Sequence, residues 1–299
     1  MIRIFGTVFA ALAGLAFGSF LNVLVTRWPE GESVVRPRSH CRHCDHVLAW
    51  WENIPLVSWV MLRGRCRACR EWIGWRYAIV EAAVGACWGF IAFEGSPSND
   101  QLSFDLLLAL TIYVICRLIF VWLLIALAVL DFEHFWLPDK ITIPGILVGF
   151  AANAFYVAVY SFWNGIFDKT HVIRGQIIWR GSWERLLEVA AAAAFLLLIR
   201  WLYWLFRRRQ GLGLGDVKLM AMIAAWLGLR SAVLALVIAV LLGTLAALVL
   251  LVVPAWRREP AAKWAATPLP FGTFLCVGGI VSSLWGAQMI SAYLHWAGF

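Results

Sequence analysis

The sequence contains few charged residues. Only 14% of its 299 residues are Asp, Glu, Lys or Arg, and 63% are hydrophobic, whereas a soluble domain is about 25% charged and about 45–50% apolar. This scarcity of charge excludes a soluble globular protein and indicates a polytopic membrane protein. The net charge of +8 is therefore interpreted first against the membrane, and we expect membrane lipid, not nucleic acid, as a partner.

The sequence also lacks the glycine-rich signatures of nucleotide-binding proteins. No G-x-G-x-x-G fingerprint of the Rossmann type is present, and the stretch 211–215 is not followed by the Gly-Lys-Ser/Thr that completes a phosphate loop. Without side chains, Gly213 and Gly215 instead allow another backbone to approach Asp216 closely. We therefore interpret this stretch as presenting an aspartate to a substrate.

Long apolar runs predict an all-α membrane protein with about eight transmembrane helices. A span needs about 20 residues, and the run at 217–229 is short enough to be a tilted span or a re-entrant helix. The first run extends beyond the apolar core of a usual secretory signal, so we interpret it as a transmembrane helix. The runs cover residues 4–26, 77–94, 104–130, 141–162, 184–206, 217–229, 231–254 and 271–296.

The distribution of Lys and Arg favours one orientation. If the N-terminus lies outside, seventeen of the 25 basic residues fall on the inner side and six on the outer side. Because cytoplasmic loops carry an excess of basic residues, we expect both termini outside and a long cytoplasmic loop after the first helix. The expected organisation is a first transmembrane helix at 1–26, a cytoplasmic module at 27–76 and a membrane core at 77–299.

Four cysteines of the cytoplasmic loop form two C-x2-C pairs with 21 residues between them. Two such pairs can surround one Zn²⁺ tetrahedrally with four thiolates, which is a closed structural site. Disulfides are the alternative, but the cytoplasm keeps thiols reduced, so we favour a metal site. The predicted zinc ligands are Cys41, Cys44, Cys66 and Cys69.

Two aspartates are expected at the same membrane face. Asp131 ends the third apolar run and Asp216 precedes the sixth, and the predicted topology places both at the cytoplasmic side. Two close carboxyl groups share a proton, so that one activates water as a base and the other donates a proton as an acid. The alternatives are a plain helix-end residue for Asp131 and an N-cap for Asp216.

Several motifs, in this order along the chain, resemble the prepilin peptidase family, the aspartic membrane enzymes that process type IV pilins and type II secretion pseudopilins. The resemblance covers nearly the whole chain. It rests on Gly18-Ser19-Phe20-Leu21-Asn22-Val23, the two cysteine pairs around Ile54-Pro55-Leu56-Val57-Ser58-Trp59, Arg76-Tyr77, Glu81, Asp131 with Leu137-Pro138-Asp139, Gly213-Leu214-Gly215-Asp216 and Pro270-Phe271-Gly272.

The resemblance implies a multi-pass protein of the bacterial inner membrane that cleaves a basic leader after Gly on the cytoplasmic side. It also implies N-methylation of the new N-terminal residue by S-adenosylmethionine, a co-substrate that the residues themselves do not reveal. Asp131 and Asp216 match the family's aspartate motifs. Three departures stand where many members have Pro, and none is expected to touch the aspartates: Arg42, Ala78 and Thr273.

Helix positions suggest how the two aspartates divide the work. Asp216 precedes a helix, whose N-terminal dipole favours a carboxylate, whereas Asp131 ends one, where the negative pole favours the protonated form. This predicts Asp216 as the resting base and Asp131 as the resting acid. Two other function classes stay open at this point: a transporter with intramembrane charges, and a non-enzymatic subunit of a secretion machine.

Overall fold

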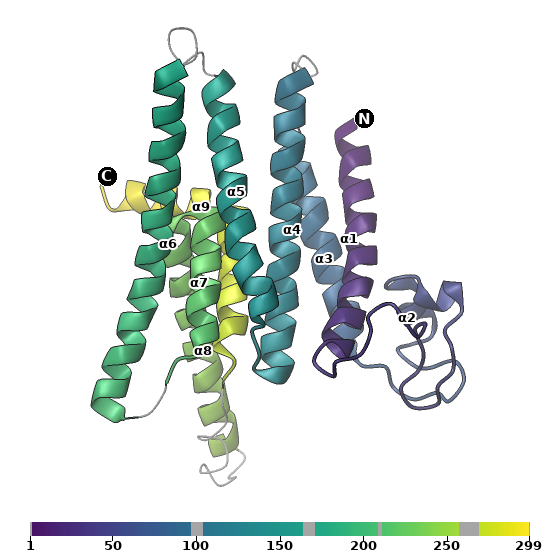
Figure 1. Cartoon of the computed structure of the whole chain (residues 1–299). Helices are drawn as coiled ribbons and strands as arrows, with labels where there is room; N and C mark the ends of the chain where they lie inside the picture. Colours follow the sequence, from purple (N-terminus) through teal and green to yellow (C-terminus); the bar gives the residue numbers. More distant parts are fainter. Residues whose placement is uncertain (1, 97–103, 164–170, 209–210, 257–268, 299) are drawn as a thin grey trace. The chain divides into compact units, whose positions relative to one another are not determined.

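The computed structural model describes residues 2–96, 104–163, 171–208, 211–256 and 269–298 (Figure 1). Within these ranges the regular elements are helices, accompanied by two isolated bridges, so the predicted all-α fold is confirmed. The elements are α1 (Ile2–Arg27), η1 (Trp50–Asn53), α2 (Val57–Met61), α3 (Trp75–Gly95), α4 (Phe104–His134), α5 (Asp139–Trp163), α6 (His171–Arg207), α7 (Leu214–Leu227), α8 (Leu229–Trp256) and α9 (Phe271–Trp296).

Six helices in the described part of the chain are long and apolar enough to cross a membrane, as expected of a multi-pass protein. Helix α5 coincides with a predicted run but is not among the six. Helix α7 has 14 residues, fewer than the about 17 that a span requires. The six candidate spans are Arg3–Arg27, Trp75–Gly95, Leu110–His134, Gly181–Arg207, Leu229–Leu250 and Phe271–Trp296.

The chain forms two compact units, residues 1–126 and residues 127–299, and α4 runs from the first into the second. The cysteine module and its supporting helices belong to the first unit, and both aspartates belong to the second. The sequence predicted a different division, into functional segments that end at residues 26 and 76. That division remains a prediction.

In the first unit, α1 and α3 lie side by side (Figure 1), and their backbones approach closely at glycines. A Cβ atom on Gly14 would lie 2.9 Å from the Cα atom of Gly85, and one on Gly18 would lie 2.8 Å from the Cα atom of Glu81. Gly14 and Gly18 are four residues apart, as are Gly85 and Gly89. Such spacing lets two membrane helices approach backbone to backbone, which fixes the base of the cysteine module.

In the second unit, α7 packs against α5, α6, α8 and α9, and most of its residues are buried. On α5, Gly145 and Gly149 leave room for Met222 and Trp226 of α7. The Trp226 ring nitrogen donates a hydrogen bond to the Gly145 carbonyl over 2.8 Å. The short helix is therefore held firmly from several sides, and its first turn has a defined position.

Candidate functional site

Asp131 and Asp216 come from different helices of the second unit and interact with each other. Asp131 lies in the last turn of α4 and Asp216 in the first turn of α7, and the two residues are only 6% and 8% exposed. The negative charge of Asp131 acts on Asp216, and both charges act on the Cys276 thiol of α9. The fold thus brings together the two carboxyl groups that sequence motifs selected.

The Asp131 carboxylate lies against the first turn of α9. The backbone N–H of Thr273 donates a hydrogen bond to Oδ2 of Asp131 over 2.7 Å. The Thr273 hydroxyl lies 3.2 Å from the same oxygen and 3.0 Å from the carbonyl oxygen of Ala128. The first N–H groups of a helix have no partner within it, so Asp131 caps the positive end of α9.

This contact corrects two expectations drawn from the sequence. The expectation that no departure from the family pattern touches the aspartates is wrong for Thr273, which contacts Asp131 directly. The premise that Asp131 faces only the negative end of its own helix is also wrong, because its side chain reaches the N-terminus of α9. Sequence reasoning missed Thr273, although Pro270 marks a helix start and thus signals free N–H groups nearby.

Asp216 is held by its own helix. Its Oδ2 atom accepts the N–H of Gly213, the N-cap residue, over 3.1 Å. Burial and the neighbouring charge of Asp131 raise the pKa of Asp216 to about 6, against the Gly213 hydrogen bond, which lowers it. Among the described residues, Asp216 therefore has one hydrogen-bond donor, the N–H of Gly213, and it lies near the negative charge of Asp131. The nearby charge favours a proton shared between the two carboxyl groups.

Leu137 packs against two glycines, Gly215 beside Asp216 and Gly272 beside Asp131. A Cβ atom on Gly215 would lie 3.0 Å from the Leu137 Cβ atom, and one on Gly272 would lie 2.9 Å from its Cδ1 atom. Leu137 belongs to the turn between α4 and α5. This turn begins at Phe135, whose backbone is left-handed with φ of 51°. At the meeting of this turn with α7 and α9, a side chain at either glycine would therefore crowd Leu137.

The basic residue nearest to the dyad in sequence is paired elsewhere. Lys218 Nζ lies 2.6 Å from Oδ1 of Asp139, at the start of α5. Both side chains are partly exposed, at 35% and 56%. The ion pair joins the N-terminal ends of α5 and α7, so the structure gives Lys218 a partner other than the two buried carboxylates.

In the first unit, the four cysteines of the two C-x2-C pairs converge. Their sulfur atoms all lie within 4.8 Å of one another, as one metal ion would require. The closest pairs, Cys41 with Cys69 and Cys44 with Cys66, are 3.8 Å and 3.9 Å apart. All four are free thiols, so the disulfide alternative is not observed, and the neighbouring histidines lie outside the four-sulfur group.

The two cysteine pairs have the same backbone conformation. The N–H of Cys41 donates to the carbonyl of His46, and the N–H of Cys66 donates to that of Glu71. Asp45 and Arg70, each four residues after the first cysteine of its pair, both adopt a left-handed conformation. This repetition within one segment is typical of two knuckles that share one metal.

The electrostatics of the cluster favour a cation. Burial opposes ionisation of Cys66, but backbone N–H groups of Ala68 and Cys69 and the neighbouring thiols lower its pKa to about 7. For Cys69, a hydrogen bond from the Glu71 backbone lowers the pKa, whereas burial and the other three thiols raise it to about 12. Four thiolates cannot coexist without a neutralising charge, and a bound Zn²⁺ would supply it.

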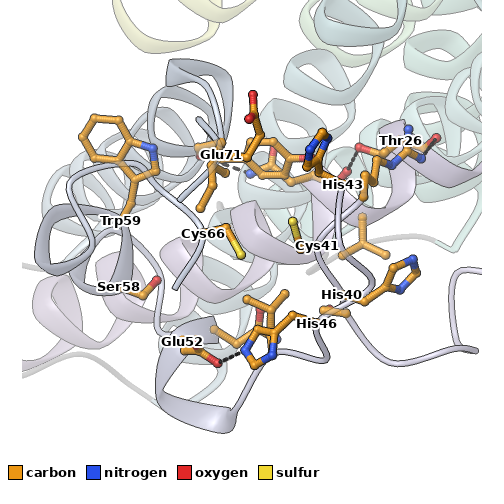
Figure 2. A pocket seen from close by; sticks show the side chains of 18 of the residues that line it. Thr26, His40, Cys41, His43, His46, Glu52, Ser58, Trp59, Cys66 and Glu71 are labelled. Atoms are coloured by element: carbon orange, nitrogen blue, oxygen red, sulfur yellow. Dashed lines mark hydrogen bonds and ion pairs between the residues drawn. The ribbon is translucent and has the colours of Figure 1, made fainter. Parts of the chain in front are cut away.

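A cavity of about 700 Å³ lies beside the cysteine cluster, between the module and the cytoplasmic ends expected for α1 and α3 (Figure 2). Small-molecule sites typically enclose about 300–1,000 Å³. Aromatic, acidic and basic side chains line it. These are Trp59, Trp72 and Tyr77, the acidic Glu30, Glu32, Asp45, Glu52, Glu71 and Glu81, the arginines Arg27, Arg42 and Arg67, and the histidines His40, His43 and His46.

Two of the acidic residues have fixed positions. Glu81 Oε2 accepts the N–H of Leu56 over 2.8 Å. Glu52 accepts the N–H of Ala49 over 2.7 Å and lies 3.3 Å from His46, as the dashed line in Figure 2 marks. Burial opposes ionisation of Glu52, but these contacts hold its pKa below the ordinary range. Its other oxygen, Oε1, is buried and has no partner.

Two family models match consecutive parts of the chain. The model described as the bacterial peptidase A24 N-terminal domain matches residues 12–94, which include the cysteine cluster and the cavity. The model described as the type IV leader peptidase family matches residues 118–248, which include both aspartates. No solved structure gives a significant match.

Curated proteins named prepilin leader peptidase/N-methyltransferase are similar to most of this chain. The protein of Stutzerimonas stutzeri is 31% identical over 96% of this chain and 93% of its own length. That of Pseudomonas aeruginosa is 31% identical, with the same two shares. That of Myxococcus xanthus is 36% identical over 76% of this chain and 58% of its own length.

Proposed function

The chain belongs to the type IV leader peptidase family, and on that premise we propose that it is a membrane aspartic endopeptidase. It removes the basic leader from type IV prepilins or type II secretion pseudopilins after Gly, and then N-methylates the new N-terminal residue with S-adenosylmethionine. The enzyme is a multi-pass protein of the inner membrane. Its catalytic residues are Asp131 and Asp216, its active site faces the cytoplasm and both termini lie outside.

The observation that carries this proposal is that Asp131 and Asp216 lie near each other, next to glycines that have no side chains. Both carboxyl groups are buried, and each accepts a backbone N–H. Gly213 is exposed and Gly215 is half-buried beside Asp216, and without side chains they let an extended substrate backbone approach. Such a pair can move protons to and from a peptide bond without a metal ion.

The chemistry follows from one ionised and one protonated carboxyl group. The ionised group takes a proton from water, whose oxygen bonds to the carbonyl carbon, while the protonated group gives its proton to the carbonyl oxygen. As the C–N bond breaks, the nitrogen receives the first proton and the second carboxylate recovers its own from the diol. One water is consumed and both carboxyl groups return to their initial states.

A structural zinc ion fits the four cysteines of the module. Cys41, Cys44, Cys66 and Cys69 would hold it, with thiolate ligands on all four sides. Such a closed site leaves no coordination position for a substrate. Zinc therefore serves to fold the module and to shape the adjoining cavity.

The methyl donor is assigned to the cavity beside the cysteine cluster. S-adenosylmethionine carries a positive sulfonium and a flat adenine, and the cavity combines carboxylates such as Glu81 with the rings of Trp59 and Tyr77. Its volume of about 700 Å³ suits a ligand of this size. When bound, the donor supplies an electrophilic methyl group to the N-terminal amine that cleavage exposes.

The experiment for the peptidase is co-expression of the full chain with a prepilin, followed by measurement of the mass of the pilin N-terminus. Asp131→Asn and Asp216→Asn should each abolish leader removal. A transporter or a non-enzymatic assembly subunit would leave the leader in place even with the wild-type chain. Normal leader removal by either variant would refute the assignment of the dyad.

A further inference from the structure

Thr273 has two hydrogen-bond donors within reach of Asp131. Its backbone N–H makes the shorter contact to Oδ2, at 2.7 Å. Its hydroxyl lies 3.2 Å from the same atom and 3.0 Å from the Ala128 carbonyl oxygen, and because it has one proton it donates to one of the two at a time. Asp216 accepts only the N–H of Gly213 among the hydrogen bonds of the described residues. Hydrogen bonds to an ionised oxygen are the strong ones, so the environment of Asp131 favours its charged form more than that of Asp216.

The helix dipoles do not explain this difference between the two carboxyl groups. Thr273 is the third residue of α9, where the positive end of the helix acts on Asp131. Asp216 also lies in the first turn of its helix, so the dipoles alone do not separate the two. The donors of Thr273 do. Its N–H contacts Asp131 over 2.7 Å, whereas the N–H of Gly213 contacts Asp216 over 3.1 Å. Its hydroxyl, which lies between Asp131 and the Ala128 carbonyl, is a second donor within reach of Asp131, and Asp216 has no such side-chain partner among the described residues.

Resting on the proposed function, we infer that Thr273 is a positioning residue that keeps Asp131 ionised, so that Asp131 is the base and Asp216 the acid. This reverses the roles that helix positions alone predict. It also means that Thr273 extends peptidase activity to lower pH, because the base remains charged in more acidic solution.

Other groups near Asp131 do not supply the same effect. Asp216 from α7 and the Cys276 thiol from α9 interact with it, and both oppose its negative charge when they ionise. On α4 itself, Nε2 of His134 lies 4.0 Å from Oε2 of Glu133. Lys218 is paired with Asp139. Thr273 is thus the group whose replacement isolates the effect.

Three substitutions separate the two donors of Thr273. Thr273→Val keeps the branched shape and the N–H but removes the hydroxyl. Thr273→Pro removes both donors, and the first turn of a helix tolerates Pro because its N–H groups have no partner within the helix. Thr273→Ser keeps both donors and controls for the change of side chain.

The test is the pH dependence of kcat/KM for prepilin cleavage by the purified full chain. We expect the acidic limb to move to higher pH by about one unit in Thr273→Val and further in Thr273→Pro. Thr273→Ser should retain the wild-type limb. A residue that only supports the fold would lower the rate equally at all pH values.

If the acidic limb lies at the same pH in the wild-type chain, Thr273→Val and Thr273→Pro, the inference is overturned. The peptidase assignment is then left intact. If Thr273→Pro does not fold, Thr273→Val alone decides, because its shape matches threonine. A wild-type chain that cleaves no prepilin would instead refute the proposed function, and with it the role of Thr273.

Discussion

A Cβ atom on Gly272 would lie 2.9 Å from Oδ2 of Asp131. Real Cβ atoms essentially never approach so closely, so any side chain at this position displaces the carboxylate or the helix. Gly272 precedes Thr273, whose N–H holds the same oxygen. The glycine is therefore required by the position of Asp131, in addition to any contact with substrate.

Gly272→Ala should lower kcat for leader cleavage by at least about tenfold, because small displacements of a catalytic group are costly. The measurement is the initial rate with saturating prepilin. Gly243→Ala in α8 is the matched control, since the nearest atom to its new Cβ would lie at an ordinary 3.5 Å. Equal rates for the two variants would contradict the close contact.

The stability of the protein should depend on pH through Asp216. The raised pKa of about 6 means that the folded state retains a proton that the unfolded state loses near pH 4. Stability from this group is fully present below about pH 4, decreases as pH rises to about 6, and is level above.

Asp216→Asn removes this dependence. In detergent, its Tm relative to wild type should rise between pH 4 and pH 6, by a few degrees, and remain constant above pH 6. Asp139→Asn, at the partly exposed partner of Lys218, provides the control and should show no such rise. A constant difference between Asp216→Asn and wild type across this pH range would contradict the raised pKa.

The purified chain should contain about one zinc ion. Cys41→Ser and Cys66→Ser should each lose it, because a four-thiolate site needs all its ligands. Cys87→Ser is the control, since this thiol of α3 lies outside the cluster. Elemental analysis of the three variants gives the result, and metal content unchanged in Cys66→Ser would exclude the site.

Removal of zinc by a chelator should unfold the module while leaving the dyad in place, because the cysteines and the aspartates belong to different units. Proteolysis after chelation should therefore cleave first within residues 27–76. Protection of this segment after complete loss of metal would show that zinc is not structural.

Glu81→Gln should slow methyl transfer at least tenfold more than leader cleavage, because it removes one negative charge from the cavity beside the cysteines. The measurement compares labelled methyl incorporation with leader loss on the same prepilin. Glu133→Gln, in the other unit, should change neither activity. If the cavity instead takes the basic leader, Glu81→Gln raises KM for cleavage, and that outcome refutes the methyl-donor assignment.

Much of the fold follows from local features of the sequence. The apolar runs match the helices closely; the run at 271–296 has the bounds of α9. Hydropathy could not mark the start of α6 at His171, since polar and charged residues precede its apolar run at 184. The spacing of the cysteines predicted their convergence, because two C-x2-C pairs have few ways to fold around one centre.

The geometry of the candidate site was predicted in part. The motifs selected Asp131 and Asp216, but the residues that hold Asp131 are far away in sequence. Thr273 lies 142 residues from it, and only the packing of α9 against α4 brings them together. Helix-end reasoning considered each helix alone, and it therefore assigned the wrong dipole environment to Asp131.

The central claim is that Asp131 and Asp216 together hydrolyse the leader peptide bond. The most direct measurement is the mass of a co-expressed prepilin produced with the wild-type chain, Asp131→Asn, Asp216→Asn and the control Asp139→Asn. We predict leader loss and an added methyl group with the wild-type chain and the control, and the intact precursor with the other two. A shortened pilin from cells that contain either Asp131→Asn or Asp216→Asn would contradict the account.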